Sequence, residues 1–72
     1  MNYKVDLKAL QKSMIENGIK TQIELAKKSD ISLKTINGIM NGKIIPSVSI
    51  MYKLASCLNM DAKTAGETFF AQ

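Results

Sequence analysis

The chain has 72 residues, of which 46% are hydrophobic, and ten basic residues against six acidic ones give it a net charge of +4. This length allows one small domain, expected to span residues 1–72, whose folding covers only about 60% of the unfolded surface. A single cysteine, Cys57, excludes an internal disulfide and a multi-cysteine metal site, and the lack of histidine argues against zinc and against histidine-based acid–base catalysis. We therefore expect no enzyme activity, no cofactor and no metal.

The sequence also lacks the marks of a membrane-bound or secreted chain. No apolar run approaches the roughly 20 residues that span a bilayer, and the polar start "MNYKVD" is not a signal peptide. A cytoplasmic protein without a membrane partner is expected. The basic surplus is compatible with nucleic-acid binding, although a solvated surface carries the same charge. All ten basic residues are lysines.

The first predicted helix begins after Asp6, whose carboxylate can accept hydrogen bonds from the free N–H groups of a first turn. Val5 and Leu10 occupy the N′ and N4 positions of a hydrophobic staple. Gly18 supplies the left-handed residue that ends the helix.

A short second helix begins at "TQIE". Thr21 is its predicted cap, and Glu24, three residues later, completes a capping box. The helix is predicted to end near Asp30, and Ser32 caps the helix that follows.

The third predicted helix contains two Asn-Gly pairs, at 37–38 and 41–42, which would suit hairpin turns. Its apolar residues nevertheless recur at helical spacing: Ile36, Ile39 and Met40. The second pair also lies where a helix favours a left-handed C-cap. A helix is therefore predicted, although Gly38 in its middle costs about 1 kcal/mol relative to alanine, so packing must compensate for it.

Two more helices complete the expected architecture. Pro46 stops the preceding segment, Ser47 caps a fourth helix, and Asn59 can end it. Asp61 caps a fifth helix that runs toward Phe69 and Phe70. Because no segment shows the sustained alternation of a strand, we expect an all-α fold of five helices.

A short helix, a three-residue turn and a second short helix match the helix-turn-helix unit, here at about residues 21–41. The second helix of such a unit enters the major groove of DNA when its exposed side carries small or polar residues. The exposed positions expected here are Leu33, Lys34, Thr35, Asn37 and Gly38.

The stretch "TQIELAKKSDISLKTINGIMNGKIIPSVSIMYKLASCLNM" resembles the Cro/CI-type (XRE-like) helix-turn-helix family of bacterial and phage repressors. The matching features are "TQ", "ELA", the Ile31–Ser32 turn, the Thr35–Ile36 pair, "NGK", Pro46 and "LASCLNM". The resemblance covers about Leu7 to Thr64. It implies a five-helix lambda-repressor-like DNA-binding domain that usually binds double-stranded operator DNA as a homodimer.

The same resemblance implies site residues by position. Gln22 matches a residue that typically bonds a backbone phosphate, and Asn41 and Lys43 match further phosphate-contacting positions. The base-reading positions are those of Leu33, Lys34, Thr35, Asn37 and Gly38. The core positions are those of Leu25, Ile36, Ile39, Leu54 and Leu58.

This chain departs from the family pattern in its DNA-facing residues. Without arginine, no bidentate guanidinium contact to guanine or phosphate is available. Three residues remain that can contact bases: Lys34 can donate a hydrogen bond to guanine, Asn37 can bond adenine, and Leu33 can pack against a thymine methyl group.

Two apolar pairs suggest an alternative function. Ile44–Ile45 lie in a predicted loop, and Phe69–Phe70 lie at the end of the last helix, where each pair either packs onto the domain or contacts another protein. The alternative is an antirepressor that binds a CI-type repressor and blocks its DNA binding. Its predicted contact residues are Leu33, Lys34, Ile44, Ile45, Phe69 and Phe70.

Overall fold

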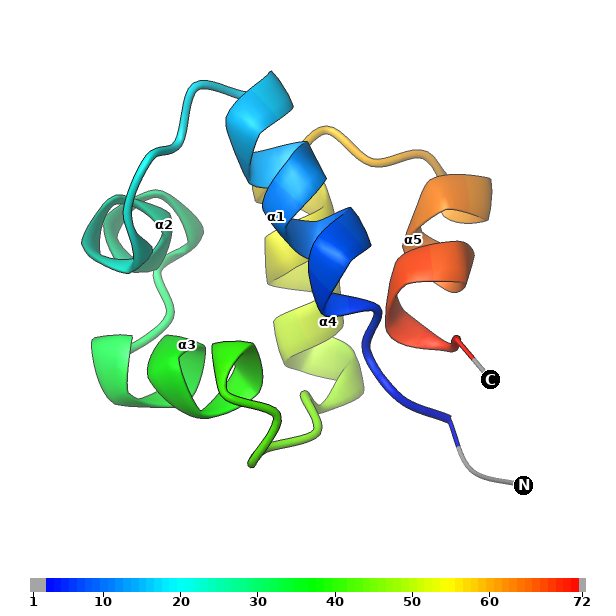
Figure 1. Ribbon diagram of the computed structural model, residues 1–72. Helices are drawn as coiled ribbons and strands as arrows, with labels where there is room; N and C mark the ends of the chain where they lie inside the picture. Colours follow the sequence, from blue (N-terminus) through cyan, green and yellow to red (C-terminus); the bar gives the residue numbers. More distant parts are fainter. Residues whose placement is uncertain (1–2, 72) are drawn as a thin grey trace.

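The computed structural model describes residues 3–71, which form five helices (Figure 1). These are α1 (Leu7–Glu16), α2 (Gln22–Ser29), α3 (Leu33–Met40), α4 (Val48–Cys57) and α5 (Ala62–Phe69). The described residues contain no strand, so the all-α prediction is confirmed for them. A hairpin at Asn37–Gly38 is ruled out, because both residues lie inside α3.

Every helix begins at the cap that the sequence predicts. In each case the side-chain oxygen of the cap accepts a hydrogen bond from the backbone N–H three residues later, at Asp6, Thr21, Ser32, Ser47 and Asp61. This bond satisfies a donor that the helix itself leaves free. At Thr21 the capping box is partial, since the hydroxyl of Thr21 donates to the Glu24 carboxylate over 3.5 Å.

The first four helices also end as predicted, at or just before residues with left-handed backbone. Gly18 (φ 71°) follows α1 and Gly42 (φ 73°) follows α3. Asp30 (φ 59°) and Asn59 (φ 54°) close α2 and α4 in the same way, although they carry side chains. Such residues let the chain reverse direction within one or two positions.

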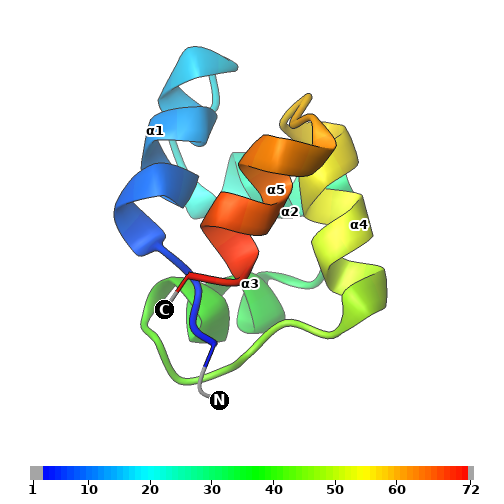
Figure 2. The same cartoon turned by 90° about the vertical axis from the view of Figure 1, so that its right-hand side faces the viewer.

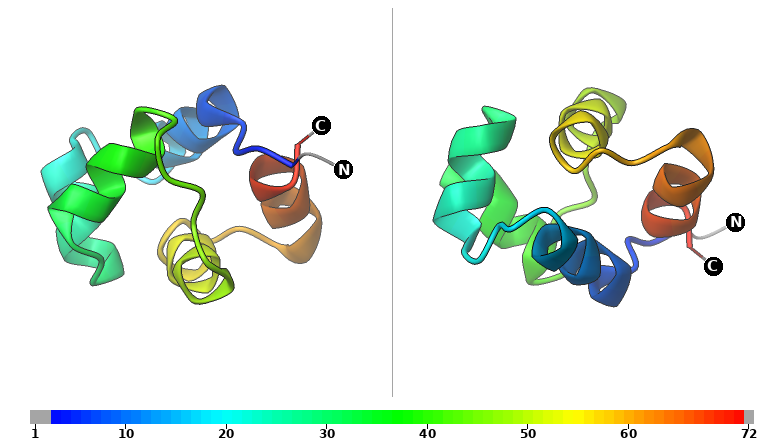
Figure 3. Two further views of the ribbon diagram at one scale, coloured as in Figure 1. Left: turned by 90° about the horizontal axis from the view of Figure 1, so that it is seen from below. Right: turned by 90° about the horizontal axis from the view of Figure 1, so that it is seen from above.

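The helices are arranged around α1 and α4. Helix α2 packs against α3 and α4, while α5 packs against α1 and α4. As a result, α2 and α3 form one side of the molecule and α5 the other (Figures 1 and 3). The two ends of the described chain meet beside α5 (Figure 2), where Lys4 and Ala71 exchange two backbone hydrogen bonds of 2.9 and 3.0 Å.

The core contains every residue that the sequence assigns to it. Its buried hydrophobic residues are Leu10, Met14, Ile19, Leu25, Ile31, Ile36, Ile39, Leu54, Leu58 and Phe69. For Phe69 the sequence left two possibilities open, packing onto the domain or contact with a partner, and it was placed among the predicted partner contacts. The structure corrects that placement, because Phe69 is only 2% exposed. Its ring packs inward from α5, so the fold itself uses this side chain.

An asparagine cluster joins the ends of α1 and α4. The side-chain amide of Asn17 donates to the carbonyls of Ser13 (2.7 Å) and Leu58 (2.9 Å). Its oxygen accepts from the side chain of Asn59 over 2.8 Å. Since Ser13 lies in α1 and Leu58 is the cap residue that follows α4, one side chain ties together segments about forty positions apart in the chain.

No helix within residues 3–71 is long and apolar enough to cross a membrane.

Candidate nucleic-acid interface

The α2–α3 unit is held together by its short turn. Asp30 adopts the left-handed conformation, and the N–H of Ile31 then donates to the carbonyl of Ala26 over 3.2 Å. Ile31 is buried, and the hydroxyl of Ser29 donates to the carbonyl of Leu25 over 2.6 Å. Polar and apolar contacts therefore fix the angle at which α3 leaves α2.

Helix α3 has one buried and one exposed side. Ile36 and Ile39 are each 1% exposed and belong to the core. Lys34, Asn37 and Asn41 are exposed, and their spacing of three and four residues places them on a single stripe. We call this stripe the outer face of α3. Within residues 3–71 none of its three side chains makes a hydrogen bond to the protein.

The other predicted base readers of α3 lie beside this stripe. Leu33 is 42% exposed at the first turn. Thr35 is half-buried, and its hydroxyl oxygen accepts a hydrogen bond from Ser32 over 2.9 Å. The hydroxyl of Thr35 therefore already takes part in the hydrogen bonding at the N-terminus of α3.

Gly38 and Ile44 fit closely together. A Cβ atom at Gly38 would overlap Cδ1 of Ile44 and would lie 2.6 Å from its Cγ1. The N–H groups of Lys43 and Ile44 both donate to the carbonyl of Gly38, over 2.8 and 3.1 Å. This packing offsets the helix-propensity cost of Gly38, as expected from the sequence. Ile44 remains 40% exposed, and Ile45 is 75% exposed.

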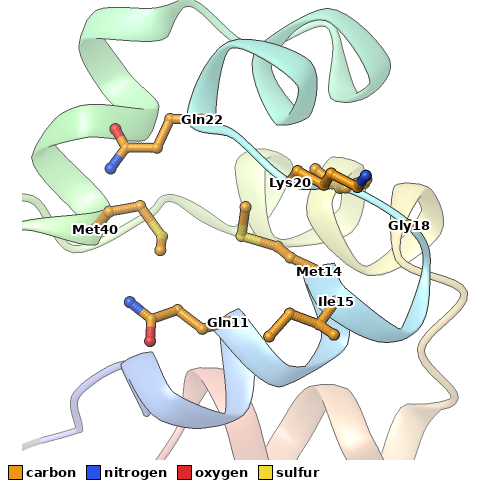
Figure 4. A pocket seen from close by; sticks show the side chains of 8 residues that line it. Gln11, Met14, Ile15, Gly18, Lys20, Gln22 and Met40 are labelled. Carbon is orange, nitrogen blue, oxygen red and sulfur yellow. The ribbon is translucent and has the colours of Figure 1, made fainter.

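Gln22, at the start of α2, is half-buried and lines a cleft of about 490 Å³ between α1, α2 and the end of α3. Figure 4 shows Gln22 and Gln11 on opposite sides of this cleft, with Met14 and Met40 between them. Lys20 lies on the same rim. Gln22 therefore lies at the N-terminus of a helix, where N–H groups and the helix dipole favour an anion. Its contact with a backbone phosphate stays a prediction.

Phe70, the other aromatic residue of the predicted partner surface, is remote from α3. It follows α5 on the opposite side of the molecule (Figure 1), partly exposed, and its ring meets Tyr3 edge to face at 5.6 Å. The structure therefore brings Leu33, Lys34, Ile44 and Ile45 to the α3 side and leaves Phe69 and Phe70 apart from them.

Within residues 3–71 no group of three potential metal ligands occurs. Burial raises the pKa of the Cys57 thiol, while the positive charge of Lys28 opposes this shift. A thiol with a raised pKa is a poor nucleophile at neutral pH, which agrees with a packing role.

Sequence reasoning missed the cleft around Gln11 and the covering of Gly38 by Ile44. Neither has a signal in the sequence pattern, because each depends on segments that only the folded chain brings together.

Comparison with known proteins identifies one family. The model of the helix-turn-helix family HTH_3 matches residues 12–63, which include α2, α3 and α4 completely. No significant match was found among curated proteins or among solved structures.

Proposed function

Because the chain belongs to the XRE-like helix-turn-helix family (HTH_3), whose members are DNA-binding regulators rather than enzymes, we propose that it is a small transcriptional regulator of a phage-type genetic switch and binds operator DNA through α3. One observation carries this proposal. The outer face of α3 presents Lys34, Asn37 and Asn41 together, with no hydrogen bonds to the rest of the described chain.

Base reading follows from the chemistry of these side chains. The amide of Asn37 can bond adenine through two atoms, and the ammonium group of Lys34 can donate to O6 and N7 of guanine. Leu33, at the first turn, offers an apolar contact for a thymine methyl group. Thr35 contributes from the edge of this face, since its hydroxyl already accepts from Ser32.

Phosphate contacts would orient the helix in the groove. Gln22 lies at the N-terminus of α2, and Asn41 and Lys43 follow α3, so the contacts flank the reading helix. Every charged contact comes from lysine, which acts as a point charge rather than a planar fork. Affinity should therefore depend strongly on salt while orientation relies on the neutral amides.

We also propose that two copies bind a two-fold operator. A helix-turn-helix dimer reads two half-sites about one helical turn apart. Val48 and Tyr52 are exposed beside an apolar groove between α4 and α5, away from the outer face of α3, and a second copy could bury them. Sedimentation at increasing concentration would measure this association.

The test begins with selection of duplexes from a random-sequence library, followed by titration of the selected duplex. Replacing Lys34 or Asn37 with alanine should cost about 1–3 kcal/mol of binding free energy and relax sequence choice. Replacing Gln22 or Lys43 should weaken binding about equally on all sequences. Salt-independent affinity, or identical effects from all four substitutions, would contradict operator reading.

A second candidate function, antirepression, is favoured by the apolar side chains next to the outer face of α3. Leu33, Ile44 and Ile45 are all exposed there, and Ile45 is the most exposed of the three. In this alternative they contact the DNA-binding domain of a CI-type repressor and so relieve repression. Burial of an isoleucine in such an interface contributes about 1.5–3 kcal/mol.

The double substitution Ile44→Lys, Ile45→Lys distinguishes the two functions. It should abolish capture of the repressor in a pull-down while circular dichroism still reports a folded helical protein. The single substitution Ile15→Lys, at an exposed position of α1, is the matched control and should leave capture unchanged. Capture that survives the double substitution would exclude this surface.

A further inference from the structure

The segment after α3 folds back onto the helix at one defined point. Two consecutive N–H groups, of Lys43 and Ile44, donate to the carbonyl of Gly38 over 2.8 and 3.1 Å. The side chain of Ile44 then covers the space where any other residue at 38 would carry its Cβ atom. Only glycine permits this approach without displacing Ile44.

The covered position belongs to the reading side of α3. Gly38 lies four residues after Lys34 and three before Asn41, and residues at these spacings share one face of a helix. Ile44 therefore borders the outer face of α3, and 40% of its surface stays exposed there. Ile45, the next residue, is more exposed. The three atoms nearest to the position of a Cβ at Gly38 all belong to Ile44, and none belongs to Ile45.

The exposed part of Ile44 is apolar and stands next to groups that bond bases. In the major groove the thymine C5-methyl group is the apolar feature that distinguishes one base from the others. We propose that Ile44 replaces the side chain that α3 lacks at Gly38 and reads a thymine methyl group, with Gly38 as its positioning residue. This inference rests on the operator binding proposed above.

Deoxyuridine provides the test, because it differs from thymidine only by the methyl group. The probe is the duplex selected from the random-sequence library, prepared with deoxyuridine at one thymidine position at a time. For the wild type, replacement at one position should weaken binding about fourfold, the effect of removing one buried methyl group. This position should differ from any thymidine that Leu33 contacts, which the variant Leu33→Ala identifies in the same scan. For Ile44→Ala, the replacement at that position should have no effect.

Gly38→Ala tests the positioning role. Alanine is the better helix former but displaces Ile44 from its packing, so these effects oppose each other and circular dichroism should still report a folded helical protein. With Ile44 displaced, the variant should lose its sensitivity to deoxyuridine at the same position as Ile44→Ala. Ile45→Ala is the matched control and should keep the wild-type sensitivity.

Three results would overturn the inference, and the failure of methyl reading is distinguishable from the failure of operator binding. If duplexes are selected but Ile44→Ala keeps the full sensitivity to deoxyuridine, or no position is sensitive in the wild type, then Ile44 does not read a methyl group although operator binding stands. If no duplex is selected at all, operator binding fails and the inference fails with it. Capture of a CI-type repressor that the double substitution Ile44→Lys, Ile45→Lys abolishes would then assign this pair to a protein contact.

Discussion

Asparagine side chains have opposite roles in two regions of this molecule. At the junction of α1 and α4, Asn17 uses both ends of its amide within the protein, bonding Ser13, Leu58 and Asn59. On the outer face of α3, Asn37 and Asn41 make no such bonds in the described chain. The difference separates polar groups that stabilise the fold from polar groups that remain available to a partner.

The largest effect is expected from Asn17→Ala. The substitution removes three hydrogen bonds and leaves the half-buried carbonyl of Leu58 without this donor. We expect the free energy of unfolding to fall by about 1–3 kcal/mol, measured by urea denaturation. A change below about 0.5 kcal/mol would show that the asparagine cluster does not hold α1 against α4.

A smaller effect is expected from Ser32→Ala, at the start of the reading helix. Ser32 accepts from the N–H of Thr35 over 3.2 Å, and alanine cannot replace this bond. The free energy of unfolding should fall by about 1 kcal/mol, as for other helix N-caps, and the variant Ser32→Asp should keep the wild-type stability. Equal stability of the alanine and aspartate variants would argue against capping as the cause.

The cap of α5 should make stability depend on pH. Hydrogen bonds from the backbone N–H and the side chain of Thr64 lower the pKa of Asp61 below its ordinary value. A lowered folded-state pKa gives a contribution that is complete above the unfolded-state pKa of about 4 and is lost as the pH falls through the folded-state value. Between pH 6 and pH 3 the melting temperature of the wild type should therefore fall more than that of Asp61→Asn. Parallel curves would contradict this role.

The smallest effect on stability is expected from Asn37→Ala, which is the counterpart of Asn17→Ala. The Asn37 side chain makes no hydrogen bond to the described chain. The substitution should therefore change the free energy of unfolding by less than about 0.5 kcal/mol in the same urea experiment. A loss comparable to that of Asn17→Ala would mean that the outer face of α3 also supports the fold.

The helices of this protein could be read from the sequence because their signals are local. A cap such as Ser32 bonds to an N–H three residues away, and a stop such as Gly42 needs only its own backbone conformation. The apolar spacing of Ile36 and Ile39 likewise predicted the buried side of α3, which the structure confirms. These interactions span at most a few residues, so the pattern contains them.

The site could be predicted less completely, since exposure depends on what the rest of the chain covers. Leu33, Lys34 and Asn37 are exposed as expected, but their contacts with DNA remain a prediction. The burial of Phe69 has no local signal, because the sequence of the last helical turn does not indicate which side of α5 faces α1 and α4.

The sequence by itself determined where every helix begins and where the first four end, which family the α2–α3 unit belongs to, and that contacts by positive charge must come from lysine. Only the tertiary structure decided that Phe69 is core, that Asn17 bonds across to Leu58, and that Ile44 covers Gly38. The physical reason is the range of the interactions. Caps and helical periodicity act between near neighbours, whereas burial and close approach depend on how separate segments pack, which no single stretch of sequence records.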